Sequence, residues 1–449
     1  MATIELKFRP GIITRVEVAE RNLLFCAAPT RTSQIPDQGS VIEWALQHPI
    51  ESPTLEHIMQ EQASRGLPGT VTVLVDDITR PTPVARILPS ILSRVASAGV
   101  PDEAVTIFVA TGTHRPMTDE ELRAKLGTDI MTRYRVINRD YRYADYVSLG
   151  STQAGTPVEV DRQVVEAKVK IAIGNVVPHV SVGWGGGSKI ILPGVCSQKT
   201  TDRMHLMACT AQPVLEVLGT RDNKPRAEMD AIAQRLGLDF ILNTVLDEEQ
   251  NILGAFAGHF VAAHRRAVEL AEQALVVPIP RQADIVIVSA IPCHVDYWQG
   301  AKPFVFSHLA VREKGVIIFL LDGEEGLCGD APSHEETVRQ FLSASFEEQL
   351  AAVDQGLVRD LAGLNVPMYH AMVRHRVSKT ICVTRHLSAG DIAALGFDQA
   401  PDVQSALEQA YQVVGPDASV GVIPFGGETL VRVAPRQPTA TAVSRHTAS

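Results

Sequence analysis

A lysine on a glycine-rich loop is the first candidate for chemistry in this chain. Lys189 ends the run Gly185-Gly186-Gly187-Ser188-Lys189, with His179 ten residues before it and His205 sixteen residues after it. Consecutive glycines leave the backbone free to adopt positive φ and to approach a bound group closely. A lysine on such a loop could bind a phosphate, form a Schiff base or carry a covalent cofactor.

The phosphate-binding motifs do not fit this loop. A P-loop requires glycine before the lysine and serine or threonine after it, whereas Ser188 precedes Lys189 and Ile190 follows it. The dinucleotide-binding fingerprint also fails, because it would place a glycine where Ser188 stands. The sequence therefore disfavours a nucleotide site of either kind, and a purely structural tight turn remains the simple alternative.

Two histidines follow segments that are typical of buried strands. His114 comes after the apolar run 105–110, and His179 comes after the apolar run 169–173. Histidine can give or take a proton near neutral pH. Two such groups facing each other across one pocket are what a reaction that inverts a stereocentre requires. Other histidines fall in helical or loop contexts, where we expect them in solvent: His48, His57, His259, His264, His334 and His446.

A zinc site is a second interpretation of the same region. His205 could be combined with His179, Cys196 and Cys209 into a set of four ligands. Their spacing matches no standard zinc pattern, and the two cysteines are equally well explained as small core residues. One histidine alone would hold a metal weakly unless a cofactor supplied the other donors.

The elements that must position these residues are apolar strands separated by helices. Segments 71–75, 105–110 and 169–173 read as strands, with helical patterns at 83–98 and 118–126 between them. This alternation predicts a parallel sheet that is covered on both faces. Ligands of such sheets bind beyond the carboxyl ends of the strands. There the sequence places Asp77 and Arg80, then His114, then His179.

A second block of the same kind predicts a second α/β domain, as 449 residues are too many for one core. Its strands are expected at 283–290, 315–321, 380–384 and 420–424. A hairpin is expected around Pro10-Gly11, and residues 22–65 read as loop and helix. We expect a first domain at 1–275, a hinge at 276–282, a second domain at 283–415 and a disordered tail at 434–449.

Composition narrows the function classes. The net charge is −10, from 41 basic and 51 acidic residues, and no basic block suits nucleic acid. Six cysteines without a CxxC pair argue against a disulfide framework. No apolar run approaches the roughly 18 residues that span a bilayer. We therefore expect a cytoplasmic protein with no membrane or nucleic-acid partner.

Taken together, the motifs resemble those of the lactate racemase family, whose enzymes carry a nickel-pincer nucleotide. The resemblance rests on five groups of residues: 77–81, 112–115, 178–194, His205, and Gln299 with Lys302. Their order and spacing agree along most of the chain. The resemblance implies an active site in the cleft between two domains, and it implies that residues 421–433 return to the first domain.

The resemblance also implies roles for individual residues. Lys189 would tether the cofactor, a pyridinium mononucleotide, and His205 would be the single protein ligand of nickel. The other residues implied to contact the cofactor are Asp77, Thr79, Gly186, Gly187, Ser188 and Gln299. The residues implied to contact the substrate are Arg80, Lys302, Gln299 and Trp298. Cofactor-biosynthesis proteins would be the partners for maturation.

In the implied reaction, His114 or His179 removes the proton from the 2-hydroxyl of a 2-hydroxy acid. Hydride leaves C2 for the cofactor and then returns to the other face of the planar 2-keto acid, while the opposite histidine returns the proton. Lactate-specific members place a tryptophan of the second domain against the substrate. Here Tyr369, His370, Arg374 or His375 would line that wall, so malate or another 2-hydroxy acid stays open.

Two other functions remain open at this point. One is a lysine- or zinc-dependent lyase, in which Lys189 would form a Schiff base. The other is a non-catalytic protein that binds the cofactor, although paired histidines would have no purpose there.

Overall fold

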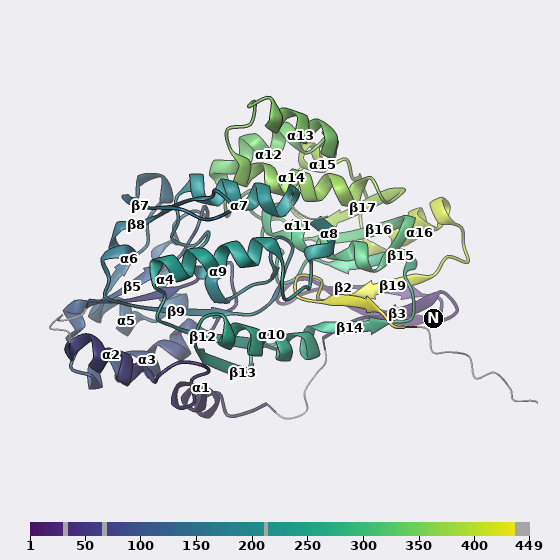
Figure 1. The fold of residues 1–449 in the computed structure, drawn as a ribbon. Coiled ribbons are helices and arrows are strands. Elements are labelled where there is room, and N and C mark those ends of the chain that lie inside the picture. The colour runs from purple at the N-terminus through teal and green to yellow at the C-terminus, as the bar shows by residue number, and fades with distance from the viewer. Residues whose placement is uncertain (30–34, 65–69, 211–213, 436–449) are drawn as a thin grey trace, which may run out of the picture.

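The computed structural model describes residues 1–29, 35–64, 70–210 and 214–435, which form two α/β lobes lying side by side (Figure 1). Each lobe is built on a six-stranded sheet whose ladders are parallel, with one exception. The predicted fold class, α/β with two mostly parallel sheets, is therefore confirmed. No helix of the described residues is long and apolar enough to cross a bilayer. The predicted tail at 434–449 lies almost entirely outside the described residues.

The first sheet has the strand order β13-β12-β9-β4-β5-β6, and only the pair β12–β13 is antiparallel. Its strands are β4 (Val71–Val75), β5 (Val105–Val109), β6 (Arg135–Ile137), β9 (Val169–Asn175), β12 (Phe240–Leu246) and β13 (Ile252–Gly258). The three strands predicted to carry the site, β4, β5 and β9, are its central neighbours. Their carboxyl ends therefore meet at one edge of the sheet.

Alternate side chains of these strands build two core layers. Val73 of β4 packs into the layer formed with α1 (Gln38–Gln47), α2 (Leu55–Ser64), α3 (Val84–Ser97) and α4 (Asp119–Leu126). Leu74, its neighbour, packs into the opposite layer with α7 (Gln198–Thr210), α9 (Lys224–Leu236) and α10 (Ala262–Leu275). The remaining helices of this lobe are α5 (Thr128–Arg133), α6 (Arg162–Glu166) and α8 (Val214–Val217). A side hairpin pairs β7 (Tyr146–Ser151) with β8 (Pro157–Asp161).

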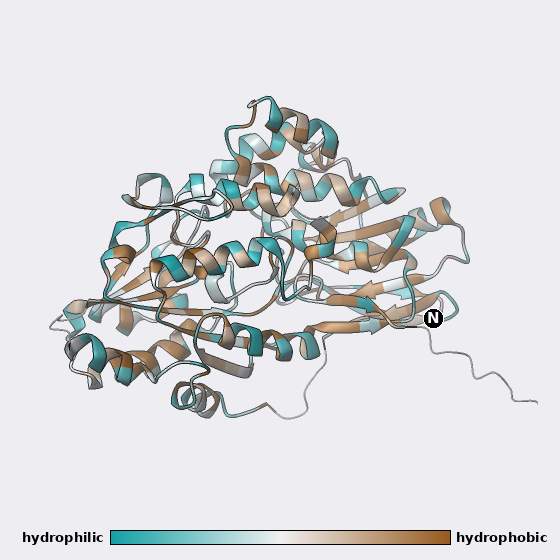
Figure 2. Cartoon of the chain, in the orientation of Figure 1, coloured by the Kyte–Doolittle hydropathy of each residue, from teal (hydrophilic) through white to brown (hydrophobic). Residues whose placement is uncertain are grey.

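The second sheet has the order β18-β17-β16-β15-β19-β3 and is parallel throughout. Its strands are β3 (Leu23–Cys26), β15 (Ala283–Ser289), β16 (Val311–Leu321), β17 (Lys379–Thr384), β18 (Asp398–Gln399) and β19 (Val420–Ile423). One face packs against α11 (Tyr297–Phe306), α12 (Glu335–Phe341), α14 (Leu361–Arg374) and α15 (Ala389–Leu395), beside α13 (Phe346–Asp354). The other face packs against α16 (Val403–Val414) and the hairpin β1 (Ala2–Arg9)–β2 (Ile12–Val18). In Figure 2 the strands of both sheets are brown, as expected for buried central strands.

The domain boundaries differ from those expected. Strand β3 lies at the edge of the second sheet, and the predicted hairpin packs on the same sheet through Leu6 and Val16. Residues 1–26 therefore belong with the second lobe, although we expected them in a first domain at 1–275. The expected return of 421–433 to the first domain is also not what the topology shows, because β19 lies between β15 and β3. Strand β3 has only four residues, too few to show an alternation of apolar and polar residues. It forms a strand because it pairs with β19.

The connection expected as a hinge at 276–282 is a strand over most of its length. Here β14 (Val276–Ile279) pairs in parallel with β20 (Leu430–Val433). The chain thus forms a two-stranded ribbon where it passes into the second lobe.

Candidate active site

A cavity of about 130 Å³ lies between the lobes at the carboxyl ends of β4, β5 and β9. Residues of both lobes line it, as expected for a site in an interdomain cleft. The predicted site residues on its wall are Asp77, Arg80, His114, His179, Gly186, Gly187, Lys189, His205, Trp298, Gln299 and Lys302. Two predicted contacts, Thr79 and Ser188, do not line this cavity; they contact Asp77 and Asp230 instead.

The first histidine is held by a carboxylate. Nδ1 of His114 lies 2.7 Å from Oδ2 of Asp77, directly beyond the end of β4. Asp77 also accepts the backbone N–H of Thr79 at 3.0 Å. Burial opposes ionisation of Asp77, but the charge and hydrogen bond of His114, with help from Arg80 and Thr79, hold its pKa below the ordinary value. Since an ionised carboxylate can only accept, the neutral form of the His114 ring carries its proton on Nδ1, and its Nε2 can then act as a base.

The second histidine is held in the opposite tautomer. His179, at the end of the two-residue strand β10 (Pro178–His179), is only 9% exposed, and its Nδ1 accepts the backbone N–H of Ser181 at 3.2 Å. Burial lowers the pKa of His179 well below its ordinary value, and the nearby charges of Lys189 and Lys302 lower it further. The neutral ring therefore carries its proton on Nε2, where it can donate a hydrogen bond; to give up a proton, the ring must first take up a second one. The cavity thus holds two neutral imidazoles of opposite tautomer, one whose Nε2 accepts a hydrogen bond and one whose Nε2 donates one.

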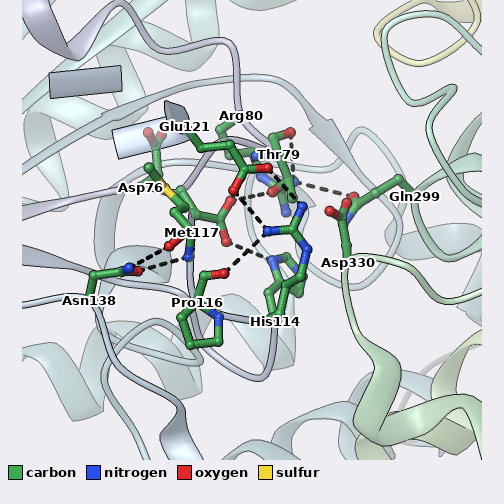
Figure 3. A network of polar contacts seen from close by, with 12 residues as sticks. Asp76, Thr79, Arg80, His114, Pro116, Met117, Glu121, Asn138, Gln299 and Asp330 are labelled. Carbon is green, nitrogen blue, oxygen red and sulfur yellow. Dashed lines mark hydrogen bonds and ion pairs between the residues drawn. The ribbon is translucent and has the colours of Figure 1, made fainter. Parts of the chain in front are cut away.

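Two cations from different lobes converge on one amide. Oε1 of Gln299 accepts a hydrogen bond from Nη1 of Arg80 at 3.4 Å and another from Nζ of Lys302. Figure 3 shows Arg80 and Thr79 of the first lobe close to Gln299 and Asp330 of the second. Burial lowers the pKa of Lys302 to about 8, with a further contribution from the charge of Arg80. Half-buried cations with so few anionic partners favour a bound carboxylate.

The glycine loop is shaped by contacts that only glycine permits. Gly186 has φ +74°, and a Cβ there would lie 2.9 Å from the carbonyl oxygen of Asn175. The amide N–H of Gly187 donates to Oδ1 of Asn243 at 2.7 Å, and the buried guanidinium of Arg226 donates to the carbonyl of Gly186 at 3.1 Å. The loop is therefore fixed from two sides, and Lys189 follows it in a turn of 3₁₀ helix at Gly187–Ile190.

Lys189 extends into the cavity without a side-chain hydrogen-bond partner among the described residues. Burial lowers its pKa well below the ordinary value, and the charges of Arg80, Lys302 and Arg226 act in the same direction. An amine whose pKa is lowered in this way is available as a nucleophile at neutral pH.

His205 lies in the middle of α7. Its Nδ1–H donates to the carbonyl of Thr201 at 2.9 Å, which leaves the lone pair of Nε2 free for a metal. Burial lowers the pKa of His205 to about 4, so the ring is neutral over the physiological range. Among the described residues, no three His, Cys, Asp or Glu side chains are grouped to hold a metal ion, so the zinc set with Cys196 and Cys209 is not assembled.

Some cavity residues were missed in the sequence. Asn175 ends β9, is 3% exposed, and has an Nδ2 with no hydrogen-bond partner. Ligands of parallel sheets bind beyond the carboxyl ends of the strands, and this strand-end rule, which indicated His179, applies equally to Asn175. Asn243 comes from β12, whose place next to β9 depends on pairing between segments about 70 residues apart.

Of the four residues predicted to line the substrate wall from the second lobe, the structure places one at the cavity. Tyr369 lines the cavity beside Asn365 and Val366, whereas His370 bonds within the second lobe to Tyr297 and to the carbonyl of Leu395. Arg374 and His375 do not line the cavity.

Two histidines expected in solvent are buried. His264 is 2% exposed and hydrogen-bonds to the carbonyl of Gly185 at 2.8 Å, below the glycine loop. His334 is fully buried, stacks on Trp298, and hydrogen-bonds to Asp360. Both were misjudged because their burial depends on contacts with residues that are distant in sequence.

The buried amine of Lys189 gives a stability prediction. In the protein without cofactor, Lys189→Met should raise the free energy of unfolding at pH 7 by about 1–3 kcal/mol, because folding no longer has to remove the proton of this lysine. The folded pKa of Lys189 lies below its unfolded value, so wild-type stability is lost as pH falls below about 10.5, the usual lysine value. The gain should therefore shrink by pH 10. Urea unfolding at both pH values measures it, with the exposed Lys168→Met as control. An equal effect of both variants would contradict the assignment.

Comparison with known proteins places this site in a family. The profile of the lactate racemase N-terminal domain matches residues 12–215, and that of the lactate racemase C-terminal domain matches residues 279–431. The chain is 28% identical to a lactate racemase of Lactiplantibacillus plantarum over 444 residues, covering 96% of this chain and all of the relative. It is also 28% identical to a lactate racemase of Thermoanaerobacterium thermosaccharolyticum over 407 residues, covering 88% of this chain and 91% of the relative.

The fold agrees with these matches. The solved structure of the lactate racemase apoprotein from Thermoanaerobacterium thermosaccharolyticum superposes with a TM-score of 0.84 at 26% identity, covering 96% of this chain and all of that one. Both domains of the family are thus present in one chain and in the same arrangement. The chain belongs to the lactate racemase family and is an isomerase of the racemase type.

Proposed function

We propose that this protein racemises or epimerises a 2-hydroxy acid at C2 by reversible hydride transfer, with His114 and His179 as opposed acid and base. The observation that carries the proposal is the pair of histidines in one cavity, each held through Nδ1 so that Nε2 is left for the substrate. Nδ1 of His114 is held by Asp77, and Nδ1 of His179 accepts the N–H of Ser181. Conversion of one enantiomer needs a neutral His114 and a protonated His179, and conversion of the other enantiomer needs the reverse.

The residues present fit the nickel-pincer nucleotide. Lys189 offers an amine of lowered pKa for a covalent tether, and His205 offers a free Nε2 lone pair for nickel. A square-planar nickel site accepts one imidazole when the cofactor supplies carbon and sulfur donors. Asn175 offers an unpartnered buried amide N–H, and Gly186 and Gly187 line the cavity beside it. When bound, this cofactor would supply an acceptor that takes hydride from C2 and returns it.

The chain's own residues would orient the substrate and move its proton. Arg80 and Lys302 would bind the carboxylate, and the unpartnered Nε2 of Gln299 could donate to substrate or cofactor. His114 would remove the 2-hydroxyl proton of one enantiomer through Nε2. His179, which must be protonated for this direction of the reaction, would return a proton to the oxygen after the planar keto acid presents its other face. Maturation by cofactor-biosynthesis proteins belongs to the same proposal.

One observation also favours a second function. The lowered pKa of Lys189 suits a Schiff base, so a lysine-dependent lyase remains the competing proposal. Trapping with borohydride in the presence of a keto acid would add the mass of that acid to Lys189. The racemase proposal expects no such adduct in the cofactor-loaded protein, because the amine is already acylated.

The first test is the tether itself. The protein, co-expressed with the cofactor's biosynthetic enzymes, should carry an adduct of mononucleotide size on the peptide containing Lys189, and it should contain nickel. Lys189→Met should lack the adduct, while Lys168→Met should retain it. Intact and peptide mass spectrometry, with metal analysis, make this measurement. An unmodified Lys189 in a nickel-free protein would count against the proposal.

The histidine roles predict a split between metal binding and catalysis. His205→Ala should lose most of its nickel, because it removes the only imidazole ligand proposed. His114→Ala and His179→Ala should keep nickel but racemise at least about 10²-fold more slowly, the usual contribution of a general acid or base. Nickel content and the rate of chiral conversion are measured on the same samples. Loss of nickel in His114→Ala, or full activity in either base variant, would contradict the assignment.

A further inference from the structure

A second cavity, of about 260 Å³, adjoins the proposed catalytic cavity. Besides Val177, the two cavities share four polar wall residues: Arg80, His179, Gln299 and Lys302. These are the groups proposed to hold the carboxylate and to move a proton. A substrate bound there would therefore have space beside it for atoms beyond C2. The methyl group of lactate would leave most of this space unused.

A buried carboxyl group faces this second cavity. Glu428 is 4% exposed, and within the described part of the chain its side chain has no hydrogen bond and no ion pair within 4 Å. An unpartnered buried carboxyl is costly, so its presence indicates a ligand that completes its hydrogen bonds. This is a feature that the reaction at C2 does not explain.

The turn that carries Glu428 is fixed in place. The amide N–H of Gly426 donates to the carbonyl of Ser289, and that of Gly427 donates to the carbonyl of Ile291, both at 2.9 Å. A Cβ at Gly427 would lie 3.0 Å from Sγ of Cys293, so glycine allows this close approach. The carboxyl is therefore held by the second lobe at a set position relative to Lys302.

The charges of the second cavity discriminate between substrates. Burial raises the pKa of Glu428 to about 7 against the opposing charges of Arg80 and Lys302. Asp330 lines the same cavity, and burial beside Asp296 raises its pKa to about 7. A second carboxylate on the substrate would meet these acidic groups, whereas hydroxyl groups would donate to them.

We propose that Glu428 is a specificity-determining residue that accepts hydrogen bonds from hydroxyl groups beyond C2. The preferred substrate is then a polyhydroxylated 2-hydroxy acid, and both lactate and a dicarboxylate such as malate are poorer. This inference rests on the proposed racemisation at C2.

The test compares kcat/KM of the nickel-loaded protein for lactate, malate, 2,3-dihydroxypropanoate and 2,3,4-trihydroxybutanoate. The trihydroxy acid should exceed lactate at least about tenfold, the smallest effect expected for hydrogen bonds to a charged group. Glu428→Leu should lower the ratio of trihydroxy acid to lactate about tenfold. Glu428→Gln should lower it less, because its amide oxygen still accepts. The exposed Glu249→Gln, near the same wall, is the charge-matched control and should leave the ratio unchanged.

The outcomes separate this inference from the proposed function. Racemisation of lactate or malate with equal or higher kcat/KM than the trihydroxy acid would overturn the specificity proposal alone. An equal loss on both substrates in Glu428→Leu would do the same. If a nickel-loaded protein with the Lys189 adduct racemises none of the four acids, the proposed function fails as well. Nickel content and the unfolding midpoint show whether Glu428→Leu is folded. If it is not, the effect of the isosteric Glu428→Gln on the substrate ratio decides whether the specificity proposal stands.

Discussion

The crowding of basic side chains in one small cavity is the constraint on which the site depends. Arg80, Lys302 and Lys189 share a space with three imidazoles, and burial leaves little water to screen their mutual repulsion. The repulsion within such a cluster falls when some of its side chains lose their charge and when anions bind beside the others. Lys189 and His179 respond in the first way, through lowered pKa values. The remaining positive charge is what makes the cavity suited to a carboxylate and to an anionic cofactor.

The fold supplies this arrangement from both lobes. The carboxyl ends of β4, β5 and β9 deliver Asp77, His114 and His179 from one side, while α11 delivers Gln299 and Lys302 from the other. Contacts between Arg80 and Gln299, and between the amide N–H of Arg115 and the carbonyl of Asp330, join the lobes next to the cavity. Neither lobe alone contains the complete site, so the relative position of the two sheets is part of the chemistry. The buried stack of Trp298 on His334 fixes one further wall from the second lobe.

Much of the site was predictable because it follows from local rules. Strands with continuous apolar runs indicated a parallel sheet, and the residues just past their ends are those that line the cavity, including Arg80. What failed depends on contacts between distant segments. The four residues of β3 form a strand only because β19 lies alongside, and the burial of His264 depends on the glycine loop above it. Glu428 lies in the turn after β19, so the strand-end rule would have found it had the last strand been weighed as the first ones were.

The central claim is that the hydrogen at C2 travels as hydride and stays inside the site, while His114 and His179 move only the hydroxyl proton. Racemisation of a substrate carrying deuterium at C2, in ordinary water, tests this most directly. The account predicts that both enantiomers at equilibrium keep the deuterium, as seen by mass spectrometry of the separated isomers. Exchange of the label with solvent at the rate of racemisation would instead show simple deprotonation at carbon and would contradict the account.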